Sequence, residues 1–137
     1  MDIKLENELG KAACLGMQNA FTPNNKPEDA RFGAAVLTRE GNIYSAGQYF
    51  SDTYSLTIHA EQAAFIHAAA HGEYIIEAIA IVSNTKHDAT YPCHMCKQIL
   101  YENYLRSKCN MKILLFNGNG KIIERLLLLD MITHAWP

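Results

Sequence analysis

The sequence lacks both a long apolar run and an excess of positive charge. Its 137 residues include 12 Lys and Arg against 14 Asp and Glu, which gives a formal net charge of −2. A membrane-spanning helix needs roughly 18 or more consecutive apolar residues, and nucleic-acid binding rests on a basic surface. We therefore expect no membrane partner and no nucleic-acid partner.

The apolar leader of a secreted protein is also missing. Charged residues recur through the first six positions, where a signal peptide needs an apolar stretch, so we expect a cytoplasmic protein. Hydrophobic residues make up 49% of the chain, which is enough for a packed core. The length suits one domain over residues 1–137.

Cysteine is scarce, and its four positions are Cys14, Cys93, Cys96 and Cys109. In a secreted miniprotein they could form two disulfides. In an intracellular domain with its own core, a close pair such as Cys93 and Cys96 is more typical of a metal or redox site. We expect Cys14 and Cys109 to be ordinary buried or half-buried thiols.

Hydrophobic periodicity and turn residues predict alternating helices and strands. The expected helices lie at residues 5–20, 59–71 and 93–105, and the expected strands at 32–37, 43–48, 78–82, 111–116 and 121–124. The apolar segment 126–129, with Ile132, predicts a last helix or an ordered tail. This order favours an α/β fold, a three-layer α/β/α sandwich around a mixed five-stranded sheet.

Chemically active side chains occur at the predicted starts of two successive helices. His59 and Glu61 open one helix, and Cys93 and Cys96 open the next, directly after Pro92. Thiolates and imidazole are the ligands that zinc prefers, and a helix N-terminus lowers the pKa of a thiol. If the two helix starts meet, His59, Cys93 and Cys96 supply three ligands. A fourth position stays open for water, as in catalytic zinc sites.

Glu61 has a role in such a site without binding the metal. A carboxylate beside the open position can act as general acid and base for the attacking water. A structural zinc site has four protein ligands and no need of this group. Glu61 therefore favours an enzyme over a non-catalytic zinc-stabilised assembly module, which is the alternative from a different functional class.

The segments His59-Ala60-Glu61 and Pro92-Cys93-His94-Met95-Cys96 together resemble the zinc-binding motifs of the cytidine deaminase superfamily. The similarity runs from about residue 32 to the C-terminus. It implies a cytidine deaminase-like fold and zinc-dependent hydrolytic deamination of a cytosine nucleoside, or an analogue, with release of ammonia. By this resemblance His59, Cys93 and Cys96 hold Zn²⁺, Glu61 moves protons, and the backbone at Ala60 reads the pyrimidine edge.

The same resemblance bears on assembly and on the branch of the superfamily. It implies a homotetramer, or otherwise a homodimer, with active sites completed across subunits. Deaminases of polynucleotides place a helix before a parallel last strand. The segment 117–120, Asn-Gly-Asn-Gly, is too short for a helix and is typical of a tight turn. The free-nucleoside branch is therefore the better match, and a small-molecule nucleoside the expected partner.

One part of the family pattern is not matched. Cytidine deaminases carry Asn-x-Glu upstream of the zinc helix to hold the ribose hydroxyls, and the corresponding positions here are Gln48 and Phe50. Gln48 can still form hydrogen bonds, but Phe50 cannot accept one. Tyr54 matches a family tyrosine. We therefore take Gln48, Phe50, Tyr54 and Ala60 as candidate substrate-binding residues and expect plain cytidine to be a modest substrate.

Several alternatives stay open at this point. Cys93 and Cys96 could form a redox pair, and Phe50 could be core packing. The aromatic Phe50 is also reminiscent of blasticidin S deaminases, so the substrate could be that antibiotic or another base such as guanine. His67 and His71 could bind metal but are expected on a helix surface or an interface, and Trp136 could fold over the active site or fray.

Overall fold

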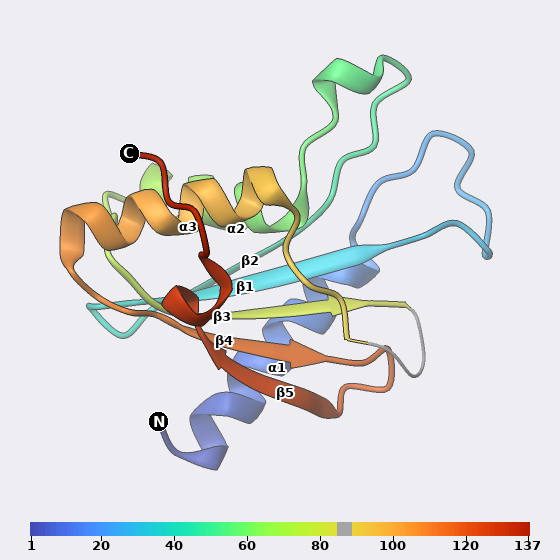
Figure 1. The fold of residues 1–137 in the computed structure, drawn as a ribbon. Coiled ribbons are helices and arrows are strands. Elements are labelled where there is room, and N and C mark those ends of the chain that lie inside the picture. Colours follow the sequence, from blue (N-terminus) through green and yellow to red (C-terminus); the bar gives the residue numbers. More distant parts are fainter. Residues whose placement is uncertain (85–88) are drawn as a thin grey trace.

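The computed structural model describes residues 1–84 and 89–137, along which helices and strands alternate (Figure 1). The helices are α1 (Ile3–Gln18), α2 (Ala60–Ala70) and α3 (His94–Ser107). The strands are β1 (Phe32–Thr38), β2 (Ile43–Gly47), β3 (Ile76–Ser83), β4 (Lys112–Phe116) and β5 (Ile122–Leu127). Two 3₁₀ turns, η1 (Tyr54–Leu56) and η2 (Leu128–Met131), complete the described elements.

The strands form one mixed sheet in the order β2-β1-β3-β4-β5. β3 and β4 run parallel, and the other neighbouring pairs run antiparallel. The parallel pair is joined through α3, as a crossover connection requires. The mixed five-stranded sheet predicted from the sequence is confirmed.

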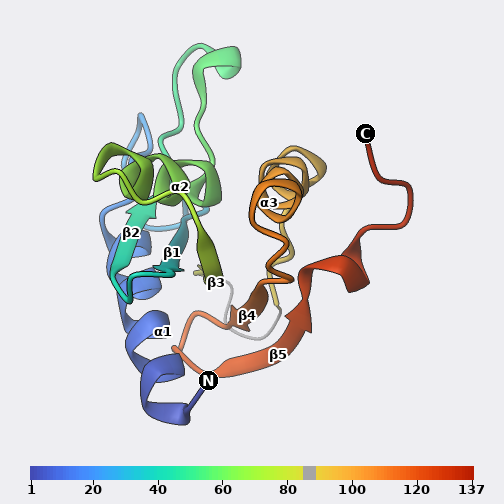
Figure 2. The same cartoon turned by 90° about the vertical axis from the view of Figure 1, so that its left-hand side faces the viewer.

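Helices cover both faces of this sheet, so the predicted three-layer arrangement is confirmed as well. α1 lies on one face, where Leu9 and Ala13 pack on Ala35 and Ala80. α2 and α3 lie on the other face, as Figure 2 shows. Their buried side chains meet the opposite side of the same strands in a second core. Alternate residues of β1 enter different cores, because successive strand side chains point to opposite faces.

The C-terminal part of the fold differs in detail from the expectation. β5 extends to Leu127 rather than ending near residue 124, and η2 follows it in place of a full helix. Antiparallel pairing with all of β4 extends the strand through the first leucines of the apolar segment. The predicted turn is present: the Asn117 side chain accepts the backbone N–H groups of Asn119 and Lys121 at 3.0 and 3.1 Å.

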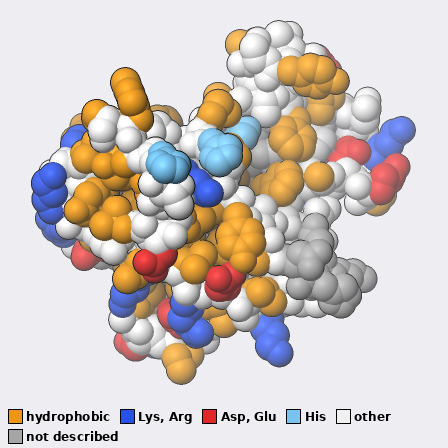
Figure 3. Space-filling view, viewed as in Figure 1, with side chains coloured by type: hydrophobic (Ala, Val, Ile, Leu, Met, Phe, Trp, Pro, Cys, Tyr) orange, Lys and Arg blue, Asp and Glu red, His pale blue; other side chains and the backbone are white. Residues whose placement is uncertain are grey.

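Two further features are the apolar length of the helices and the distribution of surface charge. Among the described residues, no helix has the length and apolar character needed to cross a membrane. On the face shown in Figure 3, basic and acidic side chains are interspersed rather than gathered into a patch of one sign.

Candidate metal centre and active site

The starts of α2 and α3 lie side by side at one end of the sheet (Figure 1). From the end of α2 the chain returns along β3 to the end of the sheet where α2 begins. α3 starts at the same end. His59 is the N-cap residue of α2 and Cys93 is the N-cap residue of α3. Topology therefore brings together two motifs that are 34 residues apart.

The three predicted ligands converge on one point. His59 Nδ1 lies 3.2 Å from Cys93 Sγ and 3.4 Å from Cys96 Sγ, and the two sulfur atoms are 3.5 Å apart. Among the described residues, this is the one group of three or more His, Cys, Asp or Glu side chains placed to hold a metal ion. Two sulfurs and an imidazole nitrogen fit zinc and are poor ligands for magnesium or calcium.

Local interactions fix this geometry. The side-chain oxygen of Gln62 accepts the backbone N–H of His59 at 3.0 Å, which pins the first turn of α2. The backbone N–H of Lys97 donates to the carbonyl of Cys93 at 2.8 Å, which closes the first turn of α3. Cys96 is fully buried and Cys93 is exposed, so the group has one protected side and one open side.

Glu61 lies beside this group, in the first turn of α2. It is 6% exposed. Burial raises the pKa of Glu61 above its ordinary value, and it also raises the pKa of the Cys96 thiol. A buried carboxyl at this place can act as a general acid and base toward a molecule held beside it.

A cavity of about 340 Å³ opens beside Glu61. Besides Glu61, His59 and Cys93, the described residues that line it are Phe32, Gln48, Phe50, Ala60, Thr90 and Tyr91. Its volume lies at the lower end of the range for small-molecule sites. Three of the four candidate substrate-binding residues, Gln48, Phe50 and Ala60, therefore come together at the metal centre.

Tyr54 is placed elsewhere. It lies in η1, on the segment that projects from the body of the fold between β2 and α2, and it is 92% exposed (Figure 1). It lines a neighbouring cavity, and of the described lining residues Phe50 and His59 are the two that this cavity shares with the pocket of Glu61. Within one chain, Tyr54 does not reach that pocket.

Three lining residues were missing from the sequence-based prediction. Thr90 and Tyr91 directly precede the Pro92-Cys93 motif, so the sequence already indicates that they lie near it. The Thr90 hydroxyl donates to Ser83 Oγ at 2.7 Å, and the Tyr91 hydroxyl donates to the Glu124 carboxylate. Phe32 reaches the pocket because β1 pairs with β2 and β3, and that pairing is a long-range feature.

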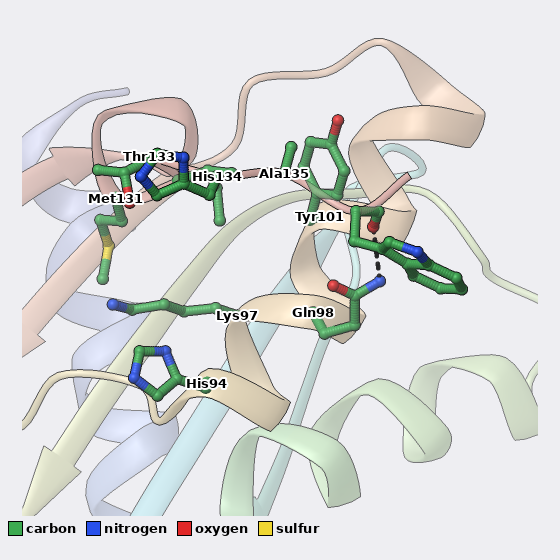
Figure 4. Close-up of a pocket in the computed structure, with 10 residues that line it drawn as sticks. His94, Lys97, Gln98, Tyr101, Met131, Thr133, His134 and Ala135 are labelled. Carbon is green, nitrogen blue, oxygen red and sulfur yellow. Dashed lines mark hydrogen bonds between the residues drawn. The ribbon is translucent and has the colours of Figure 1, made fainter.

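A second cavity, of about 370 Å³, lies between α3 and the C-terminal segment. His94, Lys97, Gln98 and Trp136 line it (Figure 4). The Gln98 side chain donates to the Trp136 carbonyl at 3.0 Å, which holds this segment against α3. Trp136 is 74% exposed and, within one chain, does not line the pocket of Glu61.

His67 lies on the surface of α2, and the exposed His71 is the C-cap residue of the same helix. Nδ1 of His67 contacts the Ser45 carbonyl at 2.9 Å, and Nδ1 of His71 contacts the His67 carbonyl at 3.0 Å. Both rings pack against Tyr44, with centroids 5.1 and 4.8 Å from its ring. These contacts attach the end of α2 to β2 and account for both side chains without a metal.

Comparison with known proteins agrees with this geometry. Residues 6–110 match the family described as the cytidine and deoxycytidylate deaminase zinc-binding region. The match spans both zinc motifs and most of the sheet. The chain belongs to this deaminase family. The resemblance inferred from the two motifs is thereby confirmed, and so is the expectation of zinc as the cofactor.

Relatives in this deaminase family cover most of the chain. A cytidine deaminase from Sporosarcina psychrophila is 34% identical over 127 residues, which is 90% of this chain and 84% of the relative. A cytidine deaminase from Halalkalibacterium halodurans is 30% identical over 116 residues, or 85% and 83% of the two chains. The solved cytidine deaminase of Burkholderia pseudomallei has a TM-score of 0.82 at 25% identity and covers 99% of this chain and 100% of its own.

Proposed function

We propose that this protein hydrolytically deaminates a cytosine nucleoside, or an analogue, to the uracil form with release of ammonia. The observation that carries the proposal is Glu61. It is buried beside three zinc-type donors and faces a pocket of small-molecule size. The names of the relatives, which are cytidine deaminases, support the same reaction. A structural zinc module gives no reason for a buried carboxyl at that place.

His59, Cys93 and Cys96 would hold the zinc ion. When bound, zinc supplies Lewis acidity that makes water a nucleophile near neutral pH. Glu61 takes a proton from the attacking water and delivers it to N3 of the cytosine ring, while the water oxygen bonds to C4. Glu61 then transfers the second proton to the amino group, the C4–N bond breaks, and ammonia leaves. The backbone at Ala60 would read the pyrimidine edge.

The pocket favours an uncharged nucleoside over a nucleotide or a polynucleotide. No Lys or Arg is present among the described residues that line it, so a phosphate group would lack the charged partners it needs. The net charge of −2 also disfavours a nucleic-acid partner. We place Gln48, Phe50 and Tyr54 near the sugar or its replacement, with Tyr54 acting from the neighbouring cavity.

Assembly and location are part of the same proposal. Residues 1–137 act as one deaminase domain, and the near-complete overlap with the solved relative supports this. We propose a homotetramer, with a homodimer as the alternative, because Tyr54 and Met95 are exposed apolar side chains that line the neighbouring cavity. A cytoplasmic location would keep the ligand thiols reduced.

The test is ammonia release by zinc-loaded protein from cytidine, deoxycytidine, cytosine, adenosine, guanine and blasticidin S. Glu61→Ala should lower turnover by roughly 10²–10⁴-fold, since it removes the acid and base, while zinc stays bound. Glu28→Ala, which removes an exposed carboxylate outside the pocket, is the matched control. Equal turnover by Glu61→Ala and wild type, or no turnover at one zinc per chain, would contradict the proposal.

A further inference from the structure

We propose that the pocket beside Glu61 does not bind sugar hydroxyl groups, and that the preferred substrate is a cytosine derivative lacking the 2′,3′-hydroxyl pair. This inference rests on the proposed deaminase function and specifies its substrate class. It follows from the hydrogen-bonding state of each polar side chain in the pocket.

Gln48 is already occupied by the fold. Its side-chain oxygen accepts the backbone N–H of Phe32 at 2.6 Å, and its side-chain nitrogen donates to the Phe21 carbonyl at 3.3 Å. Only 2% of the residue is exposed. Gln48 therefore connects β1 with the segment after α1, and it acts as a positioning residue rather than a sugar ligand.

Phe50 forms an apolar wall where a hydroxyl-binding group would be needed. Its ring packs edge-on against Phe32, with centroids 6.2 Å apart, and both rings line the pocket. A hydroxyl group that lies at the edge of either ring finds no hydrogen-bond acceptor there. The nearby carboxylate of Asp52 lines the neighbouring cavity instead of this one.

The two hydroxyl groups among the described lining residues already donate to acceptors within the protein. Thr90 donates to Ser83, and Tyr91 donates to the Glu124 carboxylate. In the proposed function Glu61 moves the protons, and His59 and Cys93 would hold the metal. Among the described lining residues, no carboxylate or amide is left to receive a pair of vicinal hydroxyls. The Thr90 and Tyr91 hydroxyl oxygens can still accept a hydrogen bond, but among the described lining residues neither replaces a carboxylate as the partner of two adjacent hydroxyls.

The consequence is a measurable preference. A polar group buried without a partner weakens binding by roughly five- to 150-fold. We expect kcat/KM for 2′,3′-dideoxycytidine to exceed that for cytidine by at least about fivefold. The ratio of the two values is the readout, because it is insensitive to the fraction of active, zinc-loaded protein.

The matched variants are Phe50→Glu and Phe50→Leu. Phe50 is half-buried, so a carboxylate there keeps access to water. Phe50→Glu supplies an acceptor and should shift the ratio toward cytidine by roughly tenfold or more. Phe50→Leu removes the aromatic ring without adding an acceptor and should keep the preference for dideoxycytidine.

Binding of both compounds to zinc-loaded Glu61→Gln, measured by calorimetry, provides a readout that does not depend on turnover. A preference for dideoxycytidine above about fivefold supports the inference. A smaller preference, or a preference for cytidine, overturns the inference and leaves the deaminase function standing. Failure of both compounds to bind, together with no turnover of any cytosine compound, overturns the inference and the proposed function together.

Discussion

Nδ1 of His59 and Sγ of Cys93 lie 3.2 Å apart, although the two residues begin different helices. Each occupies the N-cap position of its helix, where the backbone is extended. The candidate metal centre is therefore a junction between α2 and α3. Its stability depends on both helices as well as on the ligands.

Loss of a ligand should remove the metal. Cys96→Ser replaces a fully buried sulfur with a poor zinc ligand. We expect affinity to fall by more than the roughly 10–100-fold that loss of a supporting group costs. Zinc per chain, measured by elemental analysis after dialysis against a weak chelator, reports this. The half-buried Cys109→Ser is the matched control, and equal zinc in the two variants would show that Cys96 is not a ligand.

Asn103 connects α3 to the start of β3. Its side chain accepts the Ile76 N–H at 3.1 Å and donates to the Ile76 carbonyl at 3.2 Å, and it is fully buried. Asn103→Ala leaves both backbone groups unpaired, at a cost of about 1–3 kcal/mol for each. Urea unfolding should show this loss. A change below about 0.5 kcal/mol, typical of surface substitutions, would contradict it.

Gly33 allows α1 to approach β1 closely. A Cβ at this position would lie 2.1 Å from the Ala13 carbonyl oxygen and 2.4 Å from the Met17 nitrogen, both of which are helix backbone. Gly33→Ala should therefore destabilise the fold by about 1–3 kcal/mol or more. Gly41→Ala, where a Cβ meets nothing within 4 Å, tests a glycine constrained only by its φ of +91°. Thermal unfolding should rank Gly33→Ala as the less stable of the two.

The ion pair between α1 and β5 predicts a pH dependence. Arg125 donates to both Glu6 carboxylate oxygens at 2.9 Å, and this lowers the pKa of Glu6 below its ordinary value of 4.5. A depressed pKa in the folded state means that the contribution is present above pH 4.5 and is lost as pH falls through the folded value.

Wild type should therefore be more stable than Glu6→Gln at pH 7, and the gap should close on acidification. Urea midpoints of the two proteins, compared at several pH values, give the answer. Taking the difference cancels any loss of zinc at low pH that the two proteins share. A gap that is constant down to pH 2 would show that the Glu6 charge is not responsible.

The sequence predicted the type and order of the helices and strands better than it predicted the residues at which they begin and end. The first three predicted helices and all five predicted strands are present, because periodicity and turn residues are local signals. His59 and Cys93 are N-caps rather than first-turn residues, a shift of one position that depends on backbone angles. Tyr54 matches a family pattern, but it lies on the projecting segment. That placement depends on the path of residues 48–59 away from the sheet, which the motif does not encode.

The sequence by itself determined the chemistry of the metal centre and the order of the elements. Ligand type, the spacing of Cys93 and Cys96, and the short turn at 117–120 are properties of neighbouring residues, so they can be read along the chain. Only the tertiary structure decided that Gln48 is held by Phe32 and Phe21, and that Phe50 packs on Phe32. Those contacts join segments brought together by strand pairing, and they determine which polar groups remain for a substrate.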